Sequence, residues 1–231
     1  MSPMSPVVVR TRRSVGRAVV ATAMTVVSCA ACGQSNPAPR PTAVARPADP
    51  AGIDRIRTRL PADYEIAPLP TPAAPATFWG VAPGWSADPA PCGEPANVGA
   101  GAHRGWSASG PGGIVYALVT ASTEPAADLR TQCTQWSLGG RSTGTVVMAD
   151  GPPIPAVPTV SLTADITTRV ENGTETHSHA RTLLGYTDGL AISVTVVTDP
   201  GAGAARLSEQ VPVELLGAAV QAIRSTNGGT R

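Results

Sequence analysis

Alternation of apolar and polar residues is clearest in the second half of the chain. Residues 160–170 alternate and lead into Asn172-Gly173, a pair typical of a tight β-hairpin turn. Residues 176–186 return from that turn, and Asp188-Gly189 predicts a second turn into residues 191–197. The pattern therefore predicts an antiparallel meander. Two shorter β-branched runs that precede it also predict strands, and these are residues 114–120 and 145–148.

Three other segments repeat their apolar residues at the spacing of a helix. The first covers residues 53–60 and is ended by Pro61. The second runs from Pro125 to the glycine pair at 139–140, and the third begins near Pro212 and ends at residues 227–228. Their apolar positions are Ile53, Ile56 and Leu60, then Leu129, Cys133 and Trp136, and finally Leu215, Leu216, Ala219, Val220 and Ile223.

Helices and antiparallel strands in this order predict an α+β domain, in which an antiparallel β-sheet, a meander, is flanked by helices on one face. This domain is expected to span residues 51–226 and to be followed by a disordered tail at 227–231. Within it, residues 64–113 are rich in proline and glycine and predict a long irregular loop. Such a loop needs a surface on which to pack.

Charge limits the classes of partner. The chain of 231 residues has a formal net charge of +1, and its 17 basic residues are all arginine. No basic stripe attracts a polyanion, so nucleic acid is not an expected partner. Acidic residues are scattered singly, without the spacing of a calcium loop or a catalytic carboxylate pair. We expect no cofactor.

The N-terminal segment predicts export and a lipid anchor. Several arginines precede an apolar stretch, residues 18–31, whose length of about 14 residues suits a signal peptide and is too short to span a bilayer. Val26-Val27-Ser28-Cys29 resembles the lipobox at which bacterial lipoproteins are lipidated and cleaved. We therefore expect residues 1–28 to be a signal peptide and Cys29 to carry the lipid. Residues 29–50 would form a proline- and alanine-rich tether.

This segment places the protein on the extracytoplasmic face of the cell membrane, held there by its acyl chains. Cys32 is the alternative attachment site, since lipidation there would remove Cys29 and leave an even pair of cysteines downstream. A plain secretory signal is a further alternative. The paired arginines at 12–13 leave open whether export follows the general secretory or the twin-arginine route.

Cys92 and Cys133 remain in the exported domain, and in an oxidising compartment such a pair predicts a disulfide. Neither cysteine belongs to a C-x-x-C motif, so we expect a structural bridge and not a redox centre.

Aromatic residues are scarce, yet they concentrate in the predicted loop. Phe78, Trp79, Trp85 and Trp106 are therefore candidates for an apolar binding cleft. The alternative is that these rings fill the core beneath the loop.

Two motifs carry weaker chemistry. Residues 105–109 come within one residue of the G-x-S-x-G elbow of serine hydrolases, but an apparent strand and not a helix follows, which favours a tight hairpin loop. His177 and His179 project from one strand face, whereas zinc needs three or four ligands, so we interpret them as an exposed polar face. We expect no metal site and no catalytic residues.

Several motifs carry a family resemblance. Phe78-Trp79-Gly80, Trp85, Pro91-Cys92 and residues 105–116, together with the lipobox, resemble a group of uncharacterised mycobacterial envelope lipoproteins over residues 53–224. More distantly, the plan is similar to the extracellular sensor domain of the mycobacterial kinase PknH. That similarity implies an antiparallel sheet flanked by disulfide-tied helices around a cleft.

The leading hypothesis is a non-enzymatic envelope lipoprotein that binds an apolar ligand or an envelope protein through a sensor-like cleft. Two alternatives stay open. One is a lipid or glycolipid carrier, which needs a continuous apolar cavity. The other is an envelope hydrolase that uses Ser107 or Ser109, which needs one of the three histidines within reach of the serine.

Overall fold

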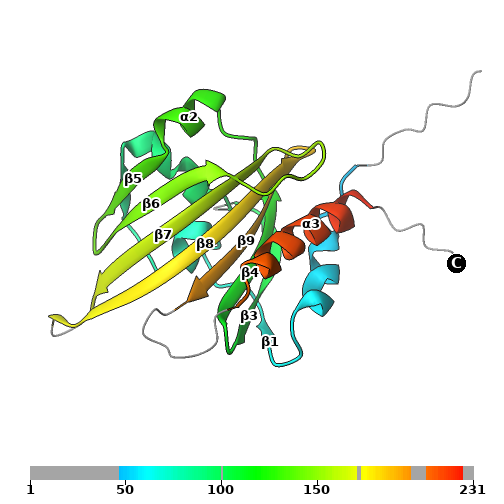
Figure 1. The fold of residues 1–231 in the computed structure, drawn as a ribbon, viewed down its shortest axis with the longest axis horizontal. Helices are drawn as coiled ribbons and strands as arrows, with labels where there is room; N and C mark the ends of the chain where they lie inside the picture. The colour runs from blue at the N-terminus through cyan, green and yellow to red at the C-terminus, as the bar shows by residue number, and fades with distance from the viewer. Residues whose placement is uncertain (1–46, 100, 171–172, 199–206, 226–231) are drawn as a thin grey trace, which may run out of the picture. The chain divides into compact units, whose positions relative to one another are not determined.

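The structure is a computed structural model that describes residues 47–99, 101–170, 173–198 and 207–225 (Figure 1). Within these residues nine strands form one antiparallel sheet, in the order β1-β3-β4-β9-β8-β7-β6-β5-β2. The predicted signal peptide, most of the tether, Cys29 and Cys32 lie outside the described residues, as does the predicted tail. The strands are β1 (Glu65–Ala67), β2 (Ser86–Asp88), β3 (His103–Gly110), β4 (Gly113–Ala121), β5 (Gln135–Gly139), β6 (Ser142–Asp150), β7 (Thr159–Arg169), β8 (Glu175–Thr187) and β9 (Leu190–Thr198).

The predicted meander is confirmed, because β6, β7, β8 and β9 are neighbours in the sheet in chain order. The pairing of β7 with β8 runs from Thr159 opposite Gly185 to Arg169 opposite Glu175. The turn between β8 and β9 is also confirmed, since Asp188 and Gly189 have φ angles of 52° and 74°. Two successive positive φ angles are what a tight hairpin turn requires, and they explain the Asp-Gly pair.

Helices pack against both faces of the sheet, whereas the sequence predicted helices on one face. Leu183 and Leu184 are consecutive on β8, so their side chains point to opposite faces. Leu183 belongs to the apolar cluster of α3 and η1, and Leu184 to the cluster of α1, η2 and α2. The two groups of helices are visible on either side of the sheet in Figure 1. The helices are η1 (Pro50–Arg59), α1 (Pro75–Phe78), η2 (Ala90–Asn97), α2 (Ala127–Gln132) and α3 (Gln210–Arg224).

Both faces of the central strands are buried beneath helices. Residues 191–196 of β9 are all buried, and these include the polar residues Ser193 and Thr195, so neither face of this strand meets water. The outer strand β6 alternates instead, with Val146 and Met148 buried and Val147 exposed. One face of the outer strands is therefore left open to solvent.

Two predictions of secondary structure were wrong. The predicted helix that begins at Pro125 ends at Gln132, and Trp136 lies on β5, which pairs with β6. The predicted loop at residues 64–113 contains three strands, of which β3 is the longest. In both segments, pairing with other strands determines the conformation.

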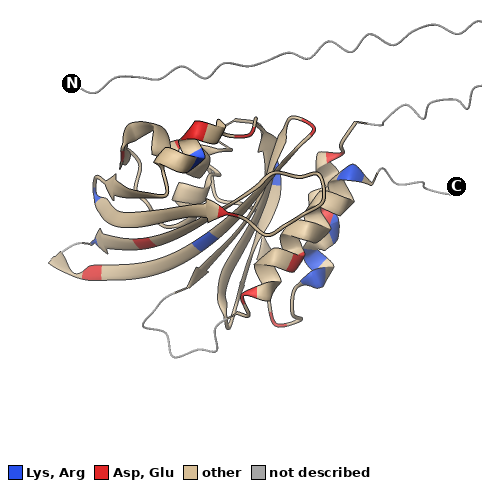
Figure 2. Ribbon diagram, turned by 45° about the horizontal axis from the view of Figure 1, so that its top comes forward, with Lys and Arg blue, Asp and Glu red and all other residues tan. Residues whose placement is uncertain are grey.

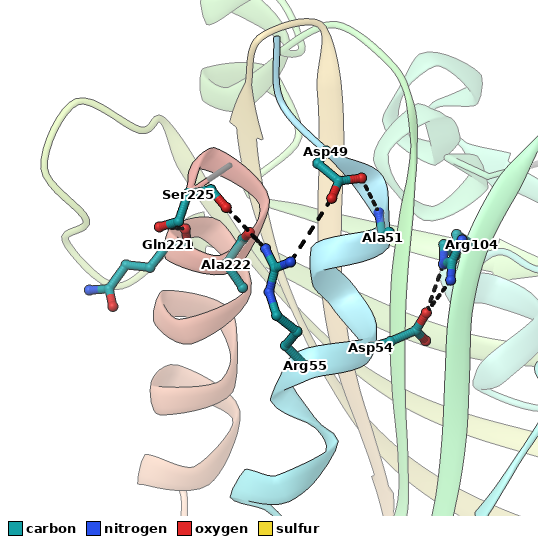
Figure 3. A network of polar contacts seen from close by, with 8 residues as sticks. All are labelled: Asp49, Ala51, Asp54, Arg55, Arg104, Gln221, Ala222 and Ser225. Carbon is teal, nitrogen blue, oxygen red and sulfur yellow. Dashed lines mark hydrogen bonds and ion pairs between the residues drawn. The ribbon is translucent and has the colours of Figure 1, made fainter. Parts of the chain in front are cut away.

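The first helix, η1, is fastened to the last helix, α3 (Figure 3). The Arg55 guanidinium donates to the main-chain oxygens of Ala222 and Ser225, which belong to the carbonyls that a helix C-terminus leaves without partners. The N–H of Asp49 donates to the oxygen of Ile223 at 2.8 Å. The chain thus enters the domain beside the C-terminus of α3.

Asp54 connects η1 to the sheet. One of its carboxylate oxygens accepts from Nε of Arg104 on β3 at 2.8 Å, and the other accepts from Arg57 at 2.6 Å. Basic and acidic residues are interspersed over η1 and α3 (Figure 2). The charges on this side of the domain are therefore used largely in contacts between elements.

The predicted disulfide is present. Cys92 on η2 is bonded to Cys133, which follows α2, with 5.3 Å between the two Cα atoms. Both cysteines are 1% exposed. The bridge joins two short elements that have little apolar surface of their own, and it holds both against the sheet.

Candidate functional site

An open pocket of about 490 Å³ lies beside α1, on the sheet face that Leu184 occupies. Its volume is in the range of small-molecule sites, roughly 300–1,000 Å³. We call it the α1 pocket. Its lining contains no Asp, Glu or Arg and consists of Phe78, Trp79, Gly80, Gly113, Ile114, Tyr116, Thr168, Thr176, His177, Ser178, Val197 and Thr198.

One side of the α1 pocket is aromatic. Phe78 of α1 and Tyr116 of β4 stack with parallel rings, whose centroids are 4.3 Å apart. Phe78 is buried, whereas Tyr116 is half-buried. Burial raises the pKa of the Tyr116 hydroxyl further above its ordinary value of 10.0. The group is neutral at physiological pH, as an ordinary tyrosine is, and can donate a hydrogen bond. Ile114, which is 38% exposed, extends the apolar surface along β4.

The other side is polar and comes from the hairpin of β7 and β8. Thr168, Thr176 and Ser178 bring hydroxyl groups to this wall. Ser178 Oγ donates to the main-chain oxygen of Trp79 at 3.1 Å, and this bond fixes the end of α1 above β8. The α1 pocket therefore places hydroxyls opposite a stacked aromatic pair.

The four predicted aromatic residues do not form one cleft. Phe78 and Trp79 line the α1 pocket. Trp106 lies in the apolar cluster of the opposite sheet face, is 0% exposed, and donates its indole N–H to the oxygen of Ile53 at 2.9 Å. Trp85 is half-buried in a separate hollow. The prediction of a shared cleft was wrong because the sheet separates Trp106 from the other three residues, and because Trp85, although it packs on the same sheet face as Trp79, lines a different hollow.

Three residues of the lining were not predicted as site residues, and these are Ile114, Tyr116 and Val197. The signal was present in the alternation of β4, where Ile114 and Tyr116 share one face and Val115 faces the other way. Phe78 stacks on Tyr116 through a tertiary contact, and the alternation of residues along β4 does not predict such a contact.

The residues of the predicted hydrolase motif do not form a nucleophile elbow. Ser107 and Ser109 lie on β3, and the Ser107 hydroxyl donates to the oxygen of Pro68 at 3.0 Å. Gly105 is required by close packing, since a Cβ atom there would lie 2.0 Å from the oxygen of Ala117. The tight hairpin turn follows these residues, between β3 and β4, where Gly110 pairs with Gly113.

His177 and His179 lie on one face of β8, as predicted from their spacing. His179 Nδ1 is 2.7 Å from an Asp165 carboxylate oxygen, and His177 Nδ1 is 3.1 Å from Thr167 Oγ1. In the described part of the chain no three or more His, Cys, Asp or Glu side chains gather as metal ligands would. None of the described helices is long and apolar enough to cross a membrane.

Comparison with known proteins places the fold. The chain resembles the crystal structure of an uncharacterised protein from Mycobacterium smegmatis, an ortholog of Rv0999, with a TM-score of 0.57 and 22% identity over 79% of this chain and 100% of the other. This likeness concerns the fold alone. No curated protein matches the sequence.

The likeness shows that an uncharacterised mycobacterial protein has a similar fold. The similarity to the PknH sensor domain and the lipoprotein character stay predictions. The matched family is described as a domain of unknown function, DUF5642, and its match extends over residues 49–224, which is most of the chain. The chain therefore belongs to the DUF5642 family.

Proposed function

We propose that this protein is a lipid-anchored envelope protein that binds a small uncharged ligand in the α1 pocket. The observation that carries the proposal is the pocket's lining, in which a stacked aromatic pair faces a wall of hydroxyls without any charged carboxylate or guanidinium. Concave sites of this size with an apolar majority and a few polar groups are typical of ligand-binding domains.

The lining also restricts the ligand. A charged group would lose its hydration in the pocket without gaining an ion pair, and that loss is costly. An apolar portion would pack on Tyr116, Ile114 and Val197, and a hydroxyl, ester or amide would pair with Thr176 or the Tyr116 hydroxyl. The proposed ligand is therefore neutral and amphipathic.

The form and lining of the pocket favour a receptor over a lipid carrier. A carrier needs a continuous apolar cavity, whereas the α1 pocket is open and one of its walls carries the hydroxyls of Thr168, Thr176 and Ser178. This lining supports the receptor hypothesis.

Binding of the neutral fluorescent dye Nile red to the purified full chain tests the proposal. Ile114→Asp places a carboxylate at the pocket wall, and we expect dye affinity to fall at least tenfold because the charge must be desolvated when the dye binds. Ile66→Asp is the matched control, since Ile66 is 43% exposed on β1 and does not line the pocket. Both side chains are exposed, so both variants should melt close to the wild type.

Equal dye affinity in the wild type and Ile114→Asp would contradict the proposal, as would an equal loss in both variants. Mass spectrometry of small molecules that copurify from the native envelope gives a second measurement. The neutral amphipathic species should be present with the wild type and with Ile66→Asp and depleted with Ile114→Asp.

A further inference from the structure

A second hollow, of about 370 Å³, lies at the β2 edge of the sheet, and it is distinct from the α1 pocket. We propose that it is a binding site for a neutral sugar, with Trp85 as the platform for the ring and Glu94 and Asn97 as partners for its hydroxyls. We call it the Trp85 hollow. Its lining consists of Gly84, Trp85, Ser86, Ala87, Ala90, Gly93, Glu94 and Asn97.

Trp85 is held rigidly although part of its surface reaches solvent. Its ring stacks near Trp136, with 6.3 Å between centroids and 24° between planes. A Cβ atom on Gly93 would lie 3.1 Å from Cη2 of Trp85, so the absence of a side chain at this glycine allows the ring to settle against η2. A fixed, half-buried indole is a preorganised apolar surface, and the aliphatic face of a sugar ring can stack on it at little cost in entropy.

The polar partners are aligned by the geometry of η2. Glu94 and Asn97 are three residues apart on this 3-10 helix, and side chains at that spacing lie one above the other. Both are exposed, and among the described residues neither has a hydrogen-bond or ion-pair partner. The disulfide at Cys92 fixes the helix that carries them.

The hydrogen-bonding capacity of this pair matches vicinal hydroxyls. A carboxylate only accepts, whereas a carboxamide both donates and accepts, and sugar hydroxyls do both. The hydroxyl of Ser86 adds a third polar group at the rim. The lining has no basic residue, so a phosphorylated or sulfated sugar has no counter-ion there.

An organic cation is the other occupant that an indole and a carboxylate can hold. Recognition of such a cation usually employs several aromatic faces around it, and Trp85 is the one aromatic residue of this lining. An amide such as Asn97 would also have no role toward a quaternary ammonium, which offers no hydrogen bond. A neutral sugar would use Trp85, Glu94 and Asn97, whereas an organic cation would use only Trp85 and Glu94.

The test is binding of the purified full chain to an array of neutral oligosaccharides built from glucose, galactose, mannose and arabinose, with choline as the cationic probe. We expect the wild type to bind at least one neutral glycan. Trp85→Ala should lose that binding, and Asn97→Ala should weaken it about tenfold, because one hydrogen-bonding partner is removed. Glu65→Gln is the control, since Glu65 is an exposed carboxylate on β1, at the opposite edge of the sheet.

Trp85→Phe is a second variant for the case in which Trp85→Ala fails to fold, since it keeps an aromatic ring at the same position. The glycan should change the tryptophan fluorescence of the wild type, and the change should be absent in this variant while the melting curve is retained. The proposal is overturned if no neutral glycan binds, if choline alone binds, or if folded Trp85→Ala and Asn97→Ala bind as the wild type does.

Discussion

The indole N–H of Trp79 donates to Thr182 Oγ1 at 3.0 Å, and Thr182 Oγ1 lies 2.8 Å from Thr195 Oγ1. Trp79 is 1% exposed, and both threonines are 0% exposed. These hydroxyls lie buried on β8 and β9 behind the α1 pocket. The hydrogen-bonded chain therefore fixes Trp79, and with it the end of α1, at one position on the sheet.

We expect Thr182→Val to lower the free energy of unfolding by about 1–3 kcal/mol, because it leaves the buried indole N–H of Trp79 without an acceptor. Thr195→Val should cost less, since Thr182 still accepts from the indole in that variant. Urea denaturation of the two variants measures the difference. Equal losses would show that the indole hydrogen bond does not determine the stability of this region.

The disulfide between Cys92 and Cys133 should make a large contribution to stability. It links residues separated by 41 positions, and closing a loop of this length restricts the unfolded chain by about 4 kcal/mol in the chain-entropy description. The double variant Cys92→Ala/Cys133→Ala should therefore melt well below the oxidised wild type. Dithiothreitol should lower the melting temperature of the wild type and leave that of the double variant unchanged. A drop in both would indicate an effect of the reagent elsewhere.

The strands that were predicted differ from those that were missed in how clearly their own residues alternate between buried and exposed positions. Residues 160–166 have buried residues at every second position, and a turn pair separates this segment from residues 176–186, so the local sequence indicates both strands and their register. β3 has only Trp106 and Ala108 buried, among glycines and serines, and its conformation follows from pairing with β4. A segment with few apolar residues, such as β3, forms a strand when it can pair with a strand such as β4 that is rich in them.

Residues 125–139 show a second limit. The spacing of Leu129, Cys133 and Trp136 fits a helix, but Trp136 and Leu138 also alternate with exposed Gln135 and Ser137. Both periods are present, and the strand prevails after Cys133 because β6 offers hydrogen bonds to it. The site was predictable only in part for the same reason, since aromatic composition identified Phe78 and Trp79 but not the face on which each ring lies.

Tyr186 should make the protein sensitive to alkali. Its side chain is 5% exposed, and its hydroxyl has no partner among the described residues. Burial, and to a lesser degree the Glu124 carboxylate, raise the pKa of Tyr186 above its ordinary value of 10.0. Below pH 10 the folded and unfolded states are both neutral at this group. Above it the unfolded state ionises first, so stability is lost as the pH rises.

We expect Tyr186→Phe to unfold less readily than the wild type at pH 11, because the variant has no proton to lose at this position. At pH 7 its stability should be equal or higher by up to about 1 kcal/mol, since a buried hydroxyl without a partner is removed. Tyr116→Phe is the comparison, and its half-buried hydroxyl should give a smaller change. Thermal melts of the three proteins between pH 7 and pH 11 measure these differences. If the melting temperature falls equally with pH in all three, Tyr186 is not the source of the sensitivity to alkali.

Lipidation at Cys29 is the last prediction, and it determines where the ligand sites act. The apolar run that precedes Ser28 positions Cys29 for processing, so the mature protein should begin with a diacylated cysteine. Two acyl chains hold a protein stably at a bilayer, whereas one alone binds it reversibly. Cys29→Ser should therefore leave the protein unlipidated and shift it out of the membrane fraction, and intact-mass analysis should show no added acyl mass.

Cys32→Ser is the matched control, because it removes the competing thiol three residues downstream and leaves the Val-Val-Ser-Cys sequence intact. This variant should be lipidated and should sediment with membranes as the wild type does. If Cys32→Ser abolishes the added mass and Cys29→Ser does not, the anchor is at Cys32. The tether to Asp49 would then be shorter by three residues, or about 9 Å when extended as polyproline. If the wild type carries no lipid, the proposed membrane anchor is wrong. The α1 pocket would then belong to a freely secreted protein.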